Sequence, residues 1–201
     1  MRPVLLLSVS LPLLLGSCGE ESKPTDTVSV NPNLKYWTKV DEVTITNCDE
    51  KTSGALIIPA TIEGKPVTVI DAAAFYERSG LTSITIPDSV TSIGGLAFSG
   101  CTGLTSISIG NGVASIGMSA FSSCSSLASI TIPDGVTKIG AAAFASCRSL
   151  TAVTFLGDAP KIIGPDAFGP ITPTTIYRKP EAKGWGETFG GRPVKLISEK
   201  P

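Results

Sequence analysis

The chain lacks histidine entirely, and this absence narrows the chemistry that its 201 residues can perform. A serine or cysteine nucleophile usually depends on histidine as its base, so a hydrolytic triad of the usual kind is excluded. Histidine is also a principal zinc ligand, which leaves few choices for a complete zinc site. We therefore expect a protein that is not an enzyme and that uses no metal or other cofactor.

Charge is scarce as well. The chain has 16 basic and 17 acidic residues, and its net charge of −1 offers no basic patch to a nucleic acid. Between Leu81 and Cys147 only Asp88, Asp134 and Lys138 are charged. The two aspartates recur in a turn position, where this residue type makes local hydrogen bonds. They do not suggest a catalytic pair of carboxylates, and no nucleic-acid partner is expected.

The chain begins with an apolar run that is too short to span a bilayer. Arg2 precedes the run Val4–Leu15, and two small residues follow before Cys18, which is the form of a secretory signal. The sequence Leu15-Gly16-Ser17-Cys18 resembles the lipobox of bacterial lipoproteins. This resemblance implies a signal peptide over residues 1–17 and a lipid anchor on Cys18. An ordinary cleaved signal followed by an incidental cysteine is the alternative.

Residues 18–33 are mostly polar, and they predict a flexible tether between the lipid and the fold. Gly19 is not the aspartate associated with retention of lipoproteins in the inner membrane. The pair Glu20-Glu21 resembles the surface-export signal of lipoproteins in some Gram-negative groups. We therefore expect an exported outer-membrane lipoprotein, and display on the cell surface is one arrangement that this leaves open.

A period of 23 residues governs the middle of the chain. Phenylalanine recurs at this step, and leucine, isoleucine and valine positions keep the same step between the phenylalanines. A period of this size indicates a solenoid, in which each unit is one coil that buries its apolar side chains against its neighbours. The aligned positions are Phe75, Phe98, Phe121 and Phe144; Leu81, Leu104, Leu127 and Leu150; Ile84, Ile107, Ile130 and Val153; and Ile93, Ile116 and Ile139.

One unit shows how a coil is built. Alternation in Leu81–Ile86 predicts a strand, and the Pro87-Asp88-Ser89 sequence predicts a turn. A second short strand is expected over Val90–Ile93, followed by a helical or 3₁₀ turn from Gly94 to Cys101. The third unit has Gly110-Asn111-Gly112 in place of the proline turn.

The ends depart from the period and predict caps. We expect an N-terminal cap and a first degenerate repeat over residues 34–70, regular repeats over residues 71–168, and a C-terminal cap over residues 169–201. Trp37 and Trp185 both lie outside the regular units. Large rings at these places suit covers over the last coils.

The repeated pattern Ala-Phe-x-x-Cys-x-x-Leu-x-x-Ile-x-Ile-Pro-x-x-Val-x-x-Ile-Gly resembles the BspA-like class of bacterial leucine-rich repeats, over roughly Leu56 to Phe168. This resemblance implies an α/β repeat that is mostly β, a right-handed leucine-rich-repeat solenoid of stacked parallel strands with short helical or 3₁₀ turns. It also implies a place on the bacterial cell surface and adhesion to host matrix proteins or other cells.

Three cysteines, Cys101, Cys124 and Cys147, form a ladder at one position of the repeat. A small thiol buried against the bend of the chain is the simplest interpretation. Because adjacent coils lie about 4.8 Å apart, a disulfide between two of them is also open, and a metal or redox role is a third alternative. Arg78 occupies the ladder position in the first unit, where we expect a solvated environment.

Hydroxyl side chains alternate with the buried residues along the predicted strands, and they are the candidate binding face. The face would be flat, uncharged and roughly 400 Å² in area, below the ~800 Å² per partner of a standard interface. A plain solvated face is the alternative. The residues are Ser83, Thr85, Ser106, Ser108, Ser129, Thr131 and Thr154.

These features favour a monomeric, non-enzymatic envelope protein that binds a protein or polysaccharide through weak contacts repeated over many copies. The alternative is a structural or assembly scaffold lipoprotein of the outer membrane, for which Tyr177, Trp185 and Phe189 would form an exposed end patch. A minor alternative is that the hydroxyl rows match an ordered lattice such as a crystalline polysaccharide.

Overall fold

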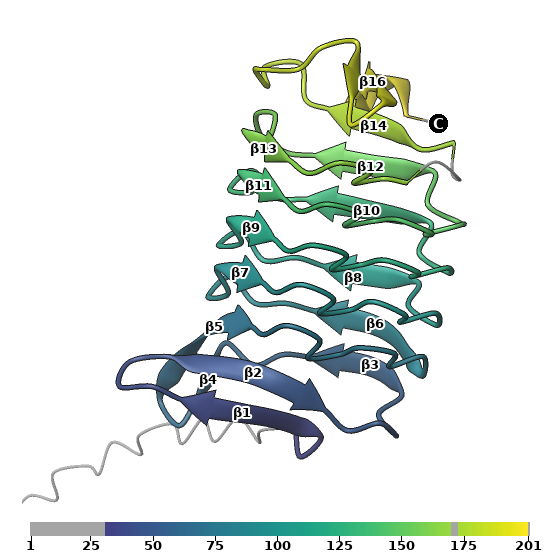
Figure 1. Cartoon of the computed structure of the whole chain (residues 1–201). Coiled ribbons are helices and arrows are strands. Elements are labelled where there is room, and N and C mark those ends of the chain that lie inside the picture. The colour runs from purple at the N-terminus through teal and green to yellow at the C-terminus, as the bar shows by residue number, and fades with distance from the viewer. Residues whose placement is uncertain (1–30, 170–172, 201) are drawn as a thin grey trace, which may run out of the picture.

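The computed structural model describes residues 31–169 and 173–200, and in it the chain winds as a stack of coils. Figure 1 shows two columns of parallel strands that rise from the N-terminal end to the C-terminal end. One column is a continuous sheet ordered β1-β2-β5-β7-β9-β11-β13, with β4 paired to β5. Its members are β1 (Leu34–Thr38), β2 (Val43–Cys48), β4 (Thr61–Ile62), β5 (Lys65–Ile70), β7 (Ser92–Ile93), β9 (Ser115–Ile116), β11 (Lys138–Ile139) and β13 (Ile162–Ile163).

The second column contains the longer strand of each coil and is split into two sheets, β3-β6-β8 and β10-β12-β14-β16-β15. Within each sheet the strands of successive coils pair in parallel and in register, so Ile84 stands beside Ile107. Ile84 and Ile86 are buried while Thr85 between them is exposed, as the alternation along a strand requires. The members are β3 (Gly54–Ile57), β6 (Leu81–Thr85), β8 (Ser106–Ser108), β10 (Ser129–Ile132), β12 (Ala152–Phe155), β14 (Thr175–Arg178), β15 (Thr188–Phe189) and β16 (Arg192–Leu196).

The phenylalanine ladder forms the centre of the core. Five rings, from Phe75, Phe98, Phe121, Phe144 and Phe168, stack face to face along the solenoid with centroid separations of 4.9, 5.3, 5.4 and 5.6 Å. Each ring is at most 1% exposed. The 23-residue step therefore corresponds to one coil, and the predicted solenoid of stacked parallel strands is confirmed.

The bends differ from the helical or 3₁₀ turns that were expected. Leu96 and Gly100 have φ of 58° and 76°, and Ser119 and Ser123 repeat these values one coil later, at 54° and 61°. A left-handed residue at every fourth position is incompatible with a right-handed helix. Alternate amides instead bond within the bend and to the next coil: Ala97 N–H donates to Gly94 O at 3.4 Å, and Phe98 N–H to Ala120 O at 2.7 Å.

The two ends are closed in different ways. At the N-terminal end the antiparallel β1–β2 hairpin adds to the first coil, and Trp37 remains 41% exposed there instead of covering the core. At the C-terminal end β16 continues the second column, and the short 3₁₀ helix Ile197–Glu199 follows it. Residues 1–30, including Cys18 and most of the predicted tether, lie outside the described residues.

Candidate binding face

Six of the seven predicted hydroxyl residues lie on the outer side of the second column. Their rows follow the strand register: Ser83 pairs with Ser106 and Thr85 with Ser108. Five of the six are exposed and Ser83 is half-buried. We call this surface the hydroxyl face; it consists of Ser83, Thr85, Ser106, Ser108, Ser129 and Thr131.

The hydroxyl groups of this face are available to a ligand. In a neighbouring column of threonines, by contrast, the hydroxyls donate hydrogen bonds to carbonyls of the preceding coil. Thr105 Oγ1 donates to Thr82 O at 3.0 Å, and Thr174 Oγ1 donates to Leu150 O at 2.7 Å. Across residues 31–169 and 173–200, no comparable bond engages a side chain of the hydroxyl face. The threonine column therefore stiffens the coils, while the face keeps its donors and acceptors open.

Thr154 does not belong to the exposed face, contrary to its predicted outward position. It is only 7% exposed, because the C-terminal segment passes over it and Lys200 Nζ donates to Thr154 Oγ1 at 3.4 Å. Its neighbour in the row, Tyr177, is also 7% exposed and has Lys200 Nζ 5.9 Å from its ring centroid. The repeat pattern places Thr154 in the row but contains no sign of the segment that covers it.

The tail aromatics form an intramolecular cover and not an exposed end patch. Trp185 and Phe189 each lie edge-on to Phe155, with centroid distances of 4.9 and 5.5 Å. Trp185 Nε1 donates to Gly157 O at 3.3 Å. Together with the burial of Tyr177, these contacts close the last coil and remove the surface that an assembly role through this patch would need.

The cysteine ladder is structural. Cys101, Cys124 and Cys147 are fully buried, and each Sγ donates to a phenylalanine carbonyl of the preceding coil, at 3.1, 3.2 and 2.9 Å. Burial raises the pKa of Cys101 to about 12. A hydrogen bond with the Cys147 thiol and burial both raise the pKa of Cys124. Cys101 and Cys124 are therefore poor nucleophiles at neutral pH, whereas the hydrogen bond with Cys124 lowers the pKa of Cys147, whose thiol is protected by its burial.

Arg78 completes the ladder differently from the solvated arrangement that was expected. Its half-buried guanidinium donates to Cys48 O at 2.8 Å, to Tyr76 O at 2.9 Å and to Asn47 Oδ1 at 3.0 Å. Cys48 is itself buried and donates from Sγ to Thr52 Oγ1 at 3.3 Å. Sequence reasoning missed this junction because neither Cys48 nor Asn47 lies in the 23-residue period.

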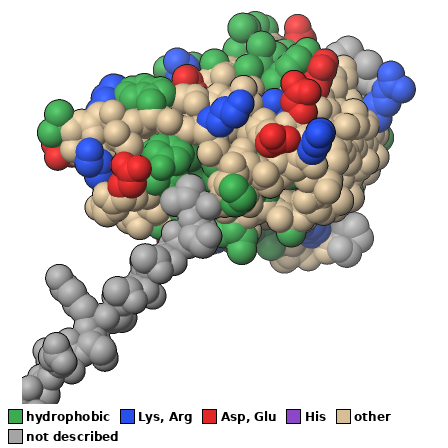
Figure 2. All heavy atoms as spheres, turned by 90° about the horizontal axis from the view of Figure 1, so that it is seen from below, with side chains coloured by type: hydrophobic (Ala, Val, Ile, Leu, Met, Phe, Trp, Pro, Cys, Tyr) green, Lys and Arg blue, Asp and Glu red, His purple; other side chains and the backbone are tan. Residues whose placement is uncertain are grey.

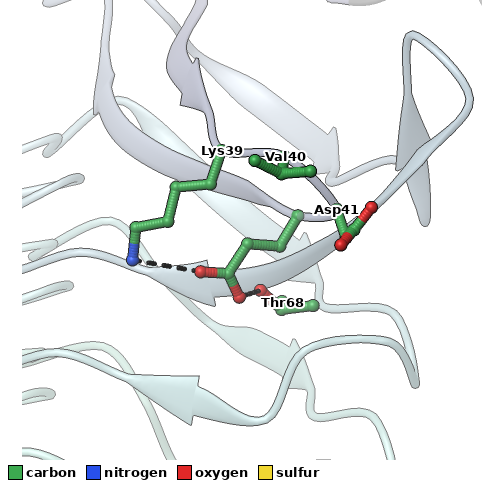
Figure 3. A pocket seen from close by; sticks show the side chains of 5 residues that line it. Lys39, Val40, Asp41 and Thr68 are labelled. Carbon is green, nitrogen blue, oxygen red and sulfur yellow. Dashed lines mark hydrogen bonds and ion pairs between the residues drawn. The ribbon is translucent and has the colours of Figure 1, made fainter.

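A hollow lies at the N-terminal end, beside the turn of the β1–β2 hairpin (Figure 3). It has about 540 Å³ of space and is lined by Lys39, Val40, Asp41, Glu42 and Thr68. Lys39 and Glu42 form an ion pair at 3.1 Å, and Thr68 Oγ1 donates to Glu42 Oε2 at 2.9 Å. The hydrogen bond from Thr68, followed by that from Lys39, lowers the pKa of Glu42.

Three polar side chains of this hollow, Lys39, Glu42 and Thr68, therefore satisfy one another. Figure 2, which views the N-terminal end, shows apolar, basic and acidic side chains intermingled without a zone of one sign. In the described part of the chain, no cluster of three or more acidic or cysteine side chains could hold a metal ion. None of the described helices is long and apolar enough to cross a membrane.

A family model for the BspA-type leucine-rich repeat region matches residues 58–176 in six copies. The chain belongs to this family. Proteins of the BspA type and their structural neighbours are generally non-enzymatic scaffolds that typically mediate protein binding. No curated protein is similar enough in sequence to count as a match.

Solved structures agree with the BspA-type assignment. A leucine-rich repeat protein of T. pallidum (TpLRR) is 33% identical, with a TM-score of 0.65 over 72% of this chain and 68% of its own. A leucine-rich repeat protein from Bacteroides capillosus is 36% identical, with a TM-score of 0.55 over 61% of this chain and 94% of its own. A leucine-rich cell surface protein from Faecalibacterium prausnitzii is 26% identical, with a TM-score of 0.61 over 74% of this chain but 38% of its own.

Proposed function

We propose that this BspA-type protein is a lipid-anchored component of the bacterial cell envelope that binds a surface ligand through the hydroxyl face. The observation that carries this proposal is the face itself: rigidly supported, uncharged, and with no intramolecular hydrogen bond to its hydroxyls in the described residues. Its chemistry is that of recognition, because no activated nucleophile or metal cluster accompanies it within those residues.

The anchor that we propose is a lipid on Cys18, and one relative supports the location that we propose. A lipid on Cys18 would tether the array through about 16 residues, a reach of at most ~55 Å. The Faecalibacterium prausnitzii relative is described as a cell surface protein, which supports export and display on the cell surface; the outer membrane is the site we propose for the anchor. The role we propose is adhesion or ligand capture by monomers, with avidity supplied by many copies on one surface.

The assembly alternative loses support from the structure. It needed an exposed aromatic end, whereas Trp185 and Phe189 pack on Phe155. The area of the hydroxyl face argues in the same direction. Its three strands of about five residues, at the strand spacing of about 4.8 Å, give roughly 240 Å², which suits weak, repeated contacts better than a permanent complex of ~800 Å² per partner.

Two experiments test the proposal. Protease shaving of intact cells should release the array from wild-type cells, and Cys18→Ala should move the protein from the membrane fraction to the soluble fraction. Densely immobilised protein should then retain cells, matrix protein or polysaccharide, and Thr85→Lys with Ser106→Lys should lower that retention. Protection of the array in intact cells, or failure to retain any of these ligands at high density, would contradict the proposal.

A further inference from the structure

The second column is interrupted in its middle, between β8 and β10. Between β6 and β8, backbone hydrogen bonds at the two ends of the strands join one coil to the next. Ile86 N–H donates to Ser108 O at 2.9 Å, and Thr105 N–H donates to Thr82 O at 2.9 Å. Among the described residues, Ile109 and Ala128 lack the corresponding bonds to Thr131 and Thr105. β8 and β10 accordingly belong to different sheets.

The interruption lies beside the Gly110-Asn111-Gly112 sequence, where the third coil has glycines in place of the proline turn of its neighbours. A Cβ atom on Gly110 would lie 2.3 Å from Pro87 O, and one on Gly112 would lie 2.0 Å from Asp88 O. A Cβ on Gly135, one coil later, would be 3.0 Å from Asn111 O. The two glycines thus let the third coil press against the second, and the space appears on its other side.

The interruption opens a groove on the hydroxyl face. Ile107 is half-buried, whereas its register mates Ile84 and Ile130 are 1% and 3% exposed. The groove encloses about 240 Å³, less than the ~300–1,000 Å³ of sites that hold a whole small molecule. It therefore suits one unit of a longer ligand. Its lining residues are Ile107, Ser108, Ile109, Asn111, Thr131, Pro133 and Leu156.

The lining restricts the chemistry of that unit. No charged side chain takes part, so a charged group would be desolvated without a partner. A purely apolar side chain would leave the Ile109 amide and the hydroxyls of Ser108 and Thr131 unsatisfied. An extended peptide cannot enter as an extra strand, because that requires about 9.6 Å between β8 and β10, whereas their Cα atoms approach within 8 Å.

We infer that the groove between β8 and β10 binds one sugar unit of a neutral polysaccharide. A neutral sugar offers hydroxyl donors and acceptors to Ser108, Thr131 and the unpaired Ile109 amide, and it offers C–H surface to Ile107 and Pro133. The rows on either side supply hydroxyls for the adjoining units of the chain. This inference rests on the proposed function and names the ligand class of its binding face.

A binding assay with matched variants tests this inference. Full-length lipidated protein, reconstituted in phosphatidylcholine liposomes, is titrated with the neutral hexasaccharides cellohexaose and maltohexaose, and with an acidic hexagalacturonate. At least one neutral probe should bind, and hexagalacturonate should not. Thr131→Lys should weaken binding at least about tenfold, and Thr85→Lys, on the same row of the hydroxyl face but beside intact backbone hydrogen bonds, should weaken it less. Met118→Lys, at an exposed residue outside the hydroxyl face, should leave binding within about twofold.

A second variant closes the groove without adding charge. Gly110→Pro with Asn111→Asp copies the turn of the neighbouring coils, and the proline ring should push the third coil away from Pro87 and toward β10. We expect slower hydrogen exchange at Ile109 and Ala128 together with loss of binding. Slower exchange with undiminished binding would overturn the inference.

The outcomes separate this inference from the proposed function. If the liposome-bound protein retains cells or matrix protein but neither neutral hexasaccharide, the sugar groove is wrong and the binding face stands. Equal losses in Thr85→Lys and Thr131→Lys would place recognition on the whole face and would also overturn the groove.

Discussion

Removing one ring from the phenylalanine column, by Phe121→Ala, probes both the stability and the cooperativity of the array. Phe121 is fully buried at the middle of the column. Its ring lies parallel to Phe98 and Phe144, at 5.3 and 5.4 Å with interplanar angles of 2° and 7°. Buried phenylalanine to alanine changes cost about 3–5 kcal/mol, of which the two ring pairs represent ~0.5–1.5 kcal/mol each.

That loss is a large share of the ~5–15 kcal/mol that stabilises a typical domain. Because each coil contacts only its neighbours, a cavity at the centre should also weaken the coupling between the two halves. Trp37 and Trp185 lie at opposite ends and report on those halves separately. The variant should therefore unfold in two separable steps.

The assay is urea unfolding followed by tryptophan emission, in Trp37→Phe and Trp185→Phe backgrounds, with circular dichroism as a global probe. Coincident transitions are expected for the parent protein, and displaced midpoints for Phe121→Ala. Phe121→Leu should lie between them. Met118→Ala serves as the exposed control, since Met118 is 60% exposed. A change below about 1 kcal/mol with coincident transitions in Phe121→Ala would refute the role assigned to the column.

Two further predictions concern titratable groups. Burial raises the pKa of Cys101 to about 12, and all three cysteines of the ladder are fully buried. Maleimide at pH 8 should therefore label Cys101, Cys124 and Cys147 only after unfolding, as measured by peptide mapping with mass spectrometry. Equal labelling of the folded protein would contradict a structural ladder. Glu42 has a pKa below its ordinary value because Thr68 and Lys39 bond its carboxylate, so its stabilising effect is present above the pKa of the unfolded chain and is lost as pH falls through the lowered value. Thr68→Val should raise the Glu42 pKa in an NMR titration, with Thr91→Val as a control because Thr91 bonds a backbone carbonyl; an unchanged Glu42 pKa would show that the hydrogen bond is not its cause.

Sequence reasoning was strongest where the period is exact. The 23-residue step placed Phe98, Leu104 and Ile116 in the core, and each is fully buried. It also put Thr85 and Ser108 side by side on the outer surface, where the strand register has them. Four copies of the repeat place equivalent residues in the same environment, so the residue type that each position of a coil requires recurs at every copy.

The features that the sequence did not reveal depend on contacts between unlike parts. Thr154 is covered by Lys200, and Arg78 bonds to Asn47; both pairings join segments that share no period. A helical or 3₁₀ turn was expected from Gly94 to Cys101, yet left-handed residues such as Leu96 are stabilised by hydrogen bonds between coils, which local propensity does not express. The Gly110-Asn111-Gly112 sequence predicts a different turn, but the separation of β8 from β10 beside it depends on how neighbouring coils approach one another.

The alternation of amides in the bends also limits how such an array can change length. If one residue were inserted in a bend, each amide after it that now bonds within the bend would point to the next coil, and each amide that now bonds to the next coil would point into the bend. Every later hydrogen bond of that bend would therefore be lost. The coil that is one residue longer agrees with this: Lys138 pairs with Ile162, 24 residues on, while Ser115 pairs with Lys138, 23 residues on. Its extra residue lies in the turn between β12 and β13, and the bend from Gly164 to Phe168 keeps its length. The turns can therefore gain or lose single residues, whereas the bends keep their length and the array grows or shrinks by whole coils.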